Sequence, residues 1–222
     1  MNMKELIIYG TGINAEIADF YFFHDAGRRA IAFTTHEQFK DRDEFLGRPV
    51  IAFEVLLEKF SPASHEVFTA IGYSEVNGVR QKRVRDVRSA GFDLTSYVSS
   101  KATFWDGFNC RENCFILEHS NIQPFAKIGR NVTMWSATSI GHHSIVEDDC
   151  FFAIGVTVSG LVTVGQSSFV GANVTIRDGV RIGKRCVIGA GAVVLEDIPA
   201  DSIVGGAGSP IWSIPSSQLR RI

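Results

Sequence analysis

The sequence predicts two parts joined end to end, an α/β domain followed by a parallel β-helix. Strand and helix patterns alternate over about the first 95 residues, and a bulky apolar residue then recurs at every sixth position over about 98–199. The 222-residue chain is long enough for one large domain or two modest ones. We expect 1–97 to form the first domain, 98–203 the β-helix, and 204–222 a C-terminal loop and tail.

The first domain follows from hydrophobic patterns taken in order along the chain. Alternation of strands and helices is typical of a small parallel sheet, here a Rossmann-like α/β domain. The predicted strands are 4–9, 30–34, 50–51, 66–71 and 92–98, and the predicted helices are 13–26, 55–60 and 81–90.

A period of six residues defines the second part, because an α-helix does not keep one face at that spacing. Three short strands joined by tight corners do, so eighteen residues complete one coil and residues eighteen apart stack. The apolar column is Ile128, Met134, Ile140, Val146, Phe152, Val158, Val164, Val170, Ile176, Ile182, Ile188 and Val194.

Two further residue types fit this frame. Glycine often follows the apolar residue, as at Gly129 and Gly141, which fits corners where side chains crowd or φ must vary. Cys114, Cys150 and Cys186 fall two coils apart in the inward column, beyond disulfide reach, so we expect free thiols.

Composition and charge exclude several classes of protein. Hydrophobic residues make up 45% of the chain and charged residues 21%, which is ordinary for a globular protein. The net charge of -2 provides no global basic field for nucleic acid or an anionic membrane. No apolar run reaches the roughly 18 residues of a membrane span, and the start of the chain lacks the layout of a secretory signal. We therefore expect a cytoplasmic protein with neither a nucleic-acid nor a membrane partner.

A glycine turn lies between the first strand and the first helix. The turn Gly10-Thr11-Gly12-Ile13 fits a phosphate site at a helix N-terminus, although a plain tight turn explains the same residues. An NAD site also needs an acidic residue near the end of the second strand, where Thr34 and Thr35 stand. Nicotinamide chemistry is therefore disfavoured, and binding of a nucleotide diphosphate remains open.

One pair of histidines occupies an outward corner of the predicted coils. His142 and His143 follow Ile140-Gly141, and the residue eighteen positions after His142 is Gly160. A glycine there leaves a notch with exposed backbone beside a titratable base. A solvated surface histidine is the alternative. A metal centre is disfavoured because His119 lies one coil plus five residues earlier, so three imidazoles do not converge in one chain.

These residues resemble the bacterial sugar acyltransferases that contain a left-handed parallel β-helix, the group with the sialic acid O-acetyltransferase and the UDP-amino-sugar N-acetyltransferase. The resemblance spans essentially the whole chain. It rests on the segments Ile8-Tyr9-Gly10-Thr11-Gly12, Ala70-Ile71-Gly72, Ser139-Ile140-Gly141-His142-His143-Ser144-Ile145-Val146 and Ile188-Gly189-Ala190-Gly191-Ala192-Val193-Val194. It implies a homotrimer, acetyl-CoA in the groove between neighbouring subunits, and a nucleotide-linked amino sugar on the first domain. From the histidine spacing above, we expect no required metal.

By position, the resemblance implies a role for each matching residue. His142 corresponds to the general base, Gly160 to the backbone that meets the acetyl group, and Ala172 and Ala190 to the path of the pantetheine arm. The remaining matches form the nucleotide-sugar pocket and are Gly10, Thr11, Gly12, Ile13 and Gly72, to which we add His143 as a substrate-binding residue.

Three positions depart from the family pattern. His143 stands where a carboxylate often follows the base, Phe151 and Phe152 stand where a second histidine often occurs, and Thr34-Thr35 replace an acidic pair. The first two bear on the rate and the strength of the base, and the third bears on which sugar and nucleotide bind.

The sequence therefore predicts N-acetylation of a nucleotide-linked amino sugar in bacterial surface glycan biosynthesis, by direct transfer. In this hypothesis His142 takes a proton from the amine while the Gly160 N–H stabilises the oxyanion. The alternatives are O-acetylation of a hydroxyl on a sugar or small metabolite, and a noncatalytic scaffold.

Overall fold

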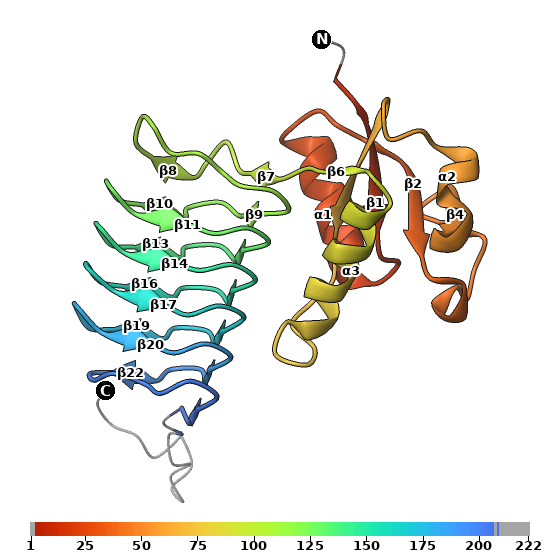
Figure 1. The fold of residues 1–222 in the computed structure, drawn as a ribbon. Coiled ribbons are helices and arrows are strands. Elements are labelled where there is room, and N and C mark those ends of the chain that lie inside the picture. Colours follow the sequence, from red (N-terminus) through yellow and green to blue (C-terminus); the bar gives the residue numbers. More distant parts are fainter. Residues whose placement is uncertain (1–2, 207, 209–222) are drawn as a thin grey trace, which may run out of the picture.

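The computed structural model describes residues 3–206 and 208 and contains two parts that lie side by side (Figure 1). The first is a sheet flanked by helices, and the second is a column of flat coils. The predicted C-terminal loop and tail, 204–222, lies largely outside the described residues. None of the helices in the described part of the chain has the length and apolar character needed to cross a bilayer.

The front sheet has the strand order β3-β4-β2-β1-β5-β6, and only the β3–β4 pair is antiparallel. The chain runs from β1 outward to β2 and β4 and then returns to the other side of β1 with β5, so β1 and β5 form its switch point. Its strands are β1 (Glu5–Tyr9), β2 (Ala30–Thr35), β3 (Glu44–Phe45), β4 (Arg48–Ala52), β5 (His65–Thr69) and β6 (Asp93–Leu94). Its helices are α1 (Ile13–His24), α2 (Leu56–Lys59) and α3 (Gly78–Ser89), with 3-10 turns at Glu37–Phe39 and Phe53–Val55.

Different helices bury the two faces of this sheet, because successive side chains of a strand point to opposite faces. Leu6 and Ile8 of β1 pack in one cluster with Phe22 of α1. Ile7 of the same strand packs in a second cluster with Val84 of α3. The small parallel sheet with alternating helices that the sequence predicts is therefore present.

One local prediction for this domain needs correction. The single strand predicted at 92–98 is wrong, because β6 pairs with β5 of the front sheet whereas β7 (Tyr97–Val98) pairs with β9 (Phe115–Ile116) of the column. The strand predicted at 50–51 is present within β4, which also forms a hairpin with β3. The turn residues Leu46 and Gly47 have φ of 51° and 72°, as a two-residue hairpin turn requires.

The second part is a parallel β-helix in a left-handed arrangement, in which each central coil adds one strand to each of three sheets and the first and last coils lack the sheet III strand. Sheet I faces the front domain and contains β7 (Tyr97–Val98), β9 (Phe115–Ile116), β12 (Thr133–Met134), β15 (Phe151–Phe152), β18 (Phe169–Val170), β21 (Val187–Ile188) and β23 (Ile203–Val204). Sheet II contains β8 (Thr103–Phe104), β10 (Asn121–Ile122), β13 (Ser139–Ile140), β16 (Thr157–Val158), β19 (Thr175–Ile176) and β22 (Val193–Val194). Sheet III contains β11 (Lys127–Ile128), β14 (Ile145–Val146), β17 (Thr163–Val164) and β20 (Arg181–Ile182).

The six-residue apolar column fills the interior of the coils. From 122 to 194 no member of the column is more than 5% exposed. Paired strands are offset by eighteen residues, as Ser139 pairs with Thr157 and Ile140 with Val158. Cys114, Cys150 and Cys186 are buried in this interior as free thiols, which confirms the prediction.

The corners show why glycine recurs, and they correct part of our interpretation. Left-handed φ values occur at the fourth place of the hexads, mostly at residues other than glycine, such as Asn131 and His143. The second-place glycines have no room for a side chain. A Cβ on Gly141 would lie 2.4 Å from the backbone of Ser159, and one on Gly165 would lie 2.6 Å from Gly183. These glycines permit close stacking of the coils rather than an unusual φ.

Shortening one inward side chain should destabilise the column. Phe152 is fully buried, so we expect Phe152→Ala to lower the free energy of unfolding by about 3–5 kcal/mol through lost contacts and a cavity. Denaturant unfolding at a fixed protein concentration measures this change. Ile203→Ala is the control, because Ile203 is 82% exposed and its truncation should change stability by no more than about 0.5 kcal/mol. Equal effects for both variants would contradict the assignment of the interior.

Candidate active site

The histidine pair lies on the corner between sheets II and III. The corner joins β13 to β14, and both His142 and His143 are exposed there. The backbone N–H of His142 donates to Oε1 of Gln123 on the coil above, at 3.0 Å. The corner is therefore fixed to its neighbouring coil while the imidazole stays accessible.

The notch predicted beside His142 is present. Gly160 lies one coil below, and a Cβ on it would come within 2.6 Å of both Cε1 and Nε2 of His142. Such a contact is shorter than van der Waals distances allow, so any side chain at 160 would displace the imidazole. The glycine is thus required by the position of the ring.

The Gly160 N–H is not free, which corrects our expectation for it. This N–H donates to Oδ1 of Asp178, one further coil down, at 2.7 Å. A donor already bonded to a carboxylate does not point at a developing oxyanion. Gly160 therefore supplies space for the imidazole, and its N–H does not supply the oxyanion contact in the geometry of the single chain.

His143 lies beside the base. Its Nδ1 is 3.3 Å from Nδ1 of His142, so one of the two rings donates and the other accepts. If His142 donates, its Nε2 carries the free lone pair, and this is the atom that faces Gly160. The backbone of His143 has φ of 60°, and its ring packs against Phe125 at 4.7 Å. His143 thus orients the base from the corner itself and lies on the β-helix, away from the glycine turn of the front sheet.

The predicted nucleotide-sugar residues gather at the switch point of the front sheet. Gly10 follows β1 with φ of +126°, and a Cβ on it would lie 3.0 Å from the carbonyl oxygen of Ala70 after β5. A Cβ on Gly72 would lie 3.0 Å from Nδ2 of Asn14 in α1. The two turns therefore approach closely at the carboxyl ends of β1 and β5, where ligands of open α/β sheets bind. Thr11, Gly12 and Ile13 connect this turn to α1, and Ile13 is 75% exposed.

Ala172 and Ala190 occupy a different corner from the histidines. They follow β18 and β21 on the corner between sheets I and II, and they lie eighteen residues apart in stacked coils. Sheet II separates this corner from His142. The Gly72 turn lies beside sheet I, because the ring of Tyr73 packs on Phe169 of β18 at 4.7 Å. One chain alone does not bring the imidazole to the other predicted residues.

Sequence reasoning missed three contacts of the histidine corner. Gln123 fixes the His142 backbone, Asp178 occupies the Gly160 N–H, and Phe125 packs on His143. Each of these residues lies eighteen or nineteen positions from its partner. The stacking rule that located Gly160 would have found them as well.

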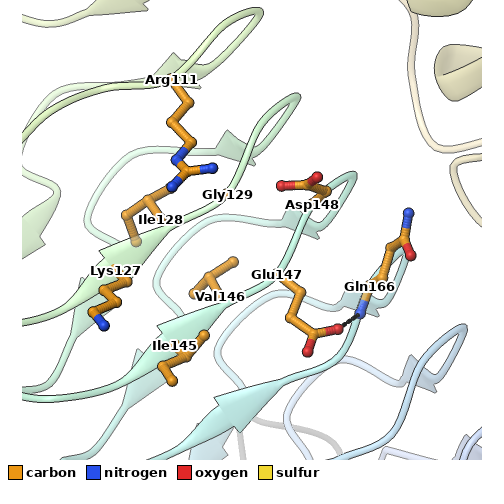
Figure 2. A pocket seen from close by; sticks show the side chains of 9 residues that line it. All are labelled: Arg111, Lys127, Ile128, Gly129, Ile145, Val146, Glu147, Asp148 and Gln166. Carbon is orange, nitrogen blue, oxygen red and sulfur yellow. Dashed lines mark hydrogen bonds between the residues drawn. The ribbon is translucent and has the colours of Figure 1, made fainter.

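A hollow of about 350 Å³ lies elsewhere, along sheet III (Figure 2). It is lined by Lys127 and Ile145 of sheet III together with Arg111, Glu147 and Asp148. None of the residues predicted for catalysis or binding lines this hollow. Within 3–206 and 208, no three His, Cys, Asp or Glu side chains are grouped so that they would hold a metal ion.

Comparison with known proteins supports this assignment of the fold. Residues 161–196 match the family model of the bacterial transferase hexapeptide (six repeats). Serine acetyltransferase of Bacillus subtilis strain 168 is 26% identical over 179 residues, covering 72% of this chain and 74% of the relative. That of Bacillus licheniformis is 24% identical over 186 residues, covering 76% and 78%.

Two solved structures share the fold over most of their length. The acetyltransferase domain of PglB from Neisseria gonorrhoeae FA1090, in complex with acetyl coenzyme A, superposes with a TM-score of 0.82 at 21% identity, covering 92% of this chain and 97% of that one. A perosamine N-acetyltransferase variant from Caulobacter crescentus, in complex with CoA and GDP-perosamine, gives a TM-score of 0.78 at 23% identity, covering 91% and 93%. The likeness extends over both the front sheet and the coils.

Adding one methyl group at the notch tests the geometry directly. Gly160 has an ordinary φ, so we expect Gly160→Ala to fold normally while its Cβ forces the His142 ring to rotate away. A crystal structure of the variant, with its melting temperature, measures both effects. An unmoved ring in Gly160→Ala would contradict the described contact.

Proposed function

We propose that this chain, an acyltransferase with the hexapeptide repeat of bacterial transferases, moves an acetyl group from acetyl-CoA to the amino group of a nucleotide-linked sugar. The observation that carries the proposal is the exposed imidazole of His142 above the bare Gly160, on a corner where a thioester has access. The proposed context is surface glycan biosynthesis in the cytoplasm of a bacterium.

The proposed step is direct transfer without a covalent enzyme intermediate. The sugar nitrogen attacks the thioester carbonyl carbon, Nε2 of His142 takes the proton from nitrogen, and the C–S bond breaks as the tetrahedral intermediate collapses. The proton on His142 then passes to the CoA thiolate. Three of the four cysteines are buried in the column, and none of these is placed for nucleophilic attack.

His143 supports this step through the tautomer of the base. In the tautomer that this step requires, Nδ1 of His142 donates to Nδ1 of His143, and Nε2 of His142 then carries the lone pair beside the notch. A neutral imidazole stabilises a protonated neighbour less than a carboxylate does, because it carries no charge. The oxyanion needs a donor other than the Gly160 N–H, which Asp178 occupies.

The switch point of the front sheet supports a nucleotide-sugar acceptor. Gly10 and Gly72 let the two turns lie close together, Gly12 leaves open space beside the backbone, and the N-terminus of the twelve-residue helix α1 attracts negative charge. A diphosphate fits both features. The solved Caulobacter structure was obtained with GDP-perosamine, a ligand of this chemical class.

We further propose that the active site is completed in a homotrimer. His142 lies on the corner between sheets II and III, whereas Ala172 and Ala190 lie across sheet II and the Gly72 turn lies beside sheet I. The histidine corner also exposes Phe125 and Leu161, which are 73% and 60% exposed with left-handed φ. Exposed bulky apolar residues in a strained conformation fit a surface that a second copy covers. A neighbouring subunit would then bring its cofactor corner to this imidazole.

A hydroxyl acceptor is the second candidate, and the sequence relatives favour it. The Bacillus relatives are serine acetyltransferases, which are named for an acceptor that carries a hydroxyl group. The front sheet argues against a free amino acid, since it offers a turn built for a phosphate-bearing ligand. Comparing a nucleotide amino sugar with its hydroxyl analogue and with serine, in one thiol-release assay, separates the candidates.

Removing the imidazole should abolish transfer. We expect His142→Ala to lower kcat by about 10²–10⁴-fold with a nucleotide amino sugar, the usual contribution of a general base. His119→Ala is the matched control, because His119 is also exposed at a left-handed corner but lies away from Gly160. Release of CoA thiol measures both. A His142→Ala enzyme within a few fold of the parent would refute the assignment.

A site shared between subunits should allow complementation. Ala190 is exposed, so Ala190→Trp should block the cofactor corner without disturbing the interior. We expect His142→Ala and Ala190→Trp each to be inactive alone and, when coexpressed, to recover about a quarter of the parental sites, the fraction of interfaces in which both intact corners meet. Activity of the mixture no higher than that of the single variants would show that each chain builds its own site.

A further inference from the structure

A buried ladder of amide and carboxyl side chains lies between the front sheet and the β-helix. Asn113, Asn131 and Asp149 hold the same left-handed corner position in three successive coils and are 2%, 1% and 6% exposed. Asn113 Nδ2 donates to Asn131 Oδ1, and Asn131 Nδ2 donates to Asp149 Oδ1, each at 2.8 Å. Polar side chains buried this deeply need hydrogen-bond partners for their donors and acceptors. The groups at the two ends of the ladder therefore bind other parts of the molecule.

The partner at the upper end is the last residue of β5. Asn113 Oδ1 accepts from the Thr69 N–H at 2.7 Å, and Asn113 Nδ2 donates to the Thr69 carbonyl oxygen at 3.3 Å. The pairing strand β6 ends at Leu94, and the Thr95 N–H makes the last bond to β5, at Val67. The Asn113 amide therefore continues the sheet edge where a strand residue would otherwise pair. The Gly72 turn begins directly after this point.

Helix α3 of the front domain binds the same ladder through Arg80 and Gln81. Arg80 is 1% exposed, and its Nε donates to Asn131 Oδ1 at 3.1 Å. Its Nη2 donates to the carbonyl oxygens of Asn131, Asp149 and Cys150. Gln81 adds a bond from Nε2 to Asp149 Oδ2 at 2.6 Å. Burial lowers the pKa of the Arg80 guanidinium to about 10, which still leaves it charged at neutral pH.

We propose that Asn113 and Arg80 are positioning residues that fix the acceptor turn at Gly72 relative to the β-helix. Binding of the nucleotide sugar then depends on them, whereas binding of the acetyl donor does not. This inference rests on the proposed function, because it assigns the Gly72 turn to the acceptor. Apolar packing alone, as between Tyr97 and Phe22, holds the two parts together but specifies direction poorly. Hydrogen bonds to both groups of the Thr69 peptide fix position and direction together.

The chemistry of the ladder explains why these residue types are needed. Thr69 presents one donor and one acceptor at a buried edge, and of the common side chains only an amide offers both in one plane. Asn131 must accept from Asn113 and from Arg80 at the same oxygen, which its two lone pairs allow. An unpaired Thr69 peptide would be buried without a partner, so the turn would shift to find water.

The test separates the acceptor from the donor kinetically. We expect Asn113→Ala to raise KM for the nucleotide amino sugar about tenfold or more, with KM for acetyl-CoA unchanged within twofold. Arg80→Lys should raise the acceptor KM less than Arg80→Met, because a lysine keeps the charge but not the forked donors. Arg185→Ala is the matched control, since Arg185 holds the same corner position two coils beyond Asp149 and is exposed.

A second measurement does not depend on activity. Hydrogen exchange should quicken in the peptide covering 66–73 of Asn113→Ala and stay unchanged in the coils at 157–188. If Asn113→Ala is too unstable to purify, Asn113→Asp retains the acceptor for the Thr69 N–H and serves for both measurements. Equal changes in the two KM values, or no change in either, would overturn the positioning role. Failure of the parent enzyme to acetylate any nucleotide amino sugar, with exchange altered as expected, would instead refute the proposed function.

Discussion

The parallel register of eighteen residues is the constraint on which the rest of the molecule depends. Each corner residue lies directly over the residue eighteen positions later, in the next coil. The residue at that later position therefore determines how much space the side chain above it has. The imidazole of His142 has room only because Gly160 lies beneath it. The same register aligns Asn113, Asn131 and Asp149 into one chain of hydrogen bonds. A shift of one residue in any coil would break both arrangements.

The sequence predicts the regular part of this structure well, because an uninterrupted column of twelve apolar residues sets the register of the coils, whereas their handedness follows only from the family resemblance. It locates His142 and Gly160 for the same reason. The local backbone conformation at the corners is harder to predict from the sequence. Left-handed φ falls on residues such as Phe125 and His143, where propensity argues against it and the corner geometry overrides that preference. The strand predicted at 92–98 fails because pattern alone does not show that its two halves pair with different sheets.

Long-range polar contacts are beyond the sequence for a different reason. Arg80 lies in a helix rich in basic residues, a composition typical of a solvent-exposed face. It is nevertheless fully buried against carbonyl oxygens about seventy residues away in the sequence. The occupied N–H of Gly160 follows the stacking rule, since Asp178 lies eighteen residues later. The contact between Gly160 and Asp178 could therefore be predicted from the sequence. The Arg80 contacts could not, because they depend on how the front domain docks on the coils.

The docking of the front domain bears on which acceptor reaches the base. The coils resemble those of serine acetyltransferases and of a perosamine N-acetyltransferase, so the coils alone do not specify the molecule that receives the acetyl group. Under the proposed function, the part of the molecule beside the coils selects the acceptor. Here that is a sheet whose switch point carries Gly10 and Gly72, held to the column through the Thr69 peptide. If the acceptor is a nucleotide-linked sugar, as proposed, this rigid second anchor would hold the nucleotide and so place the sugar relative to His142.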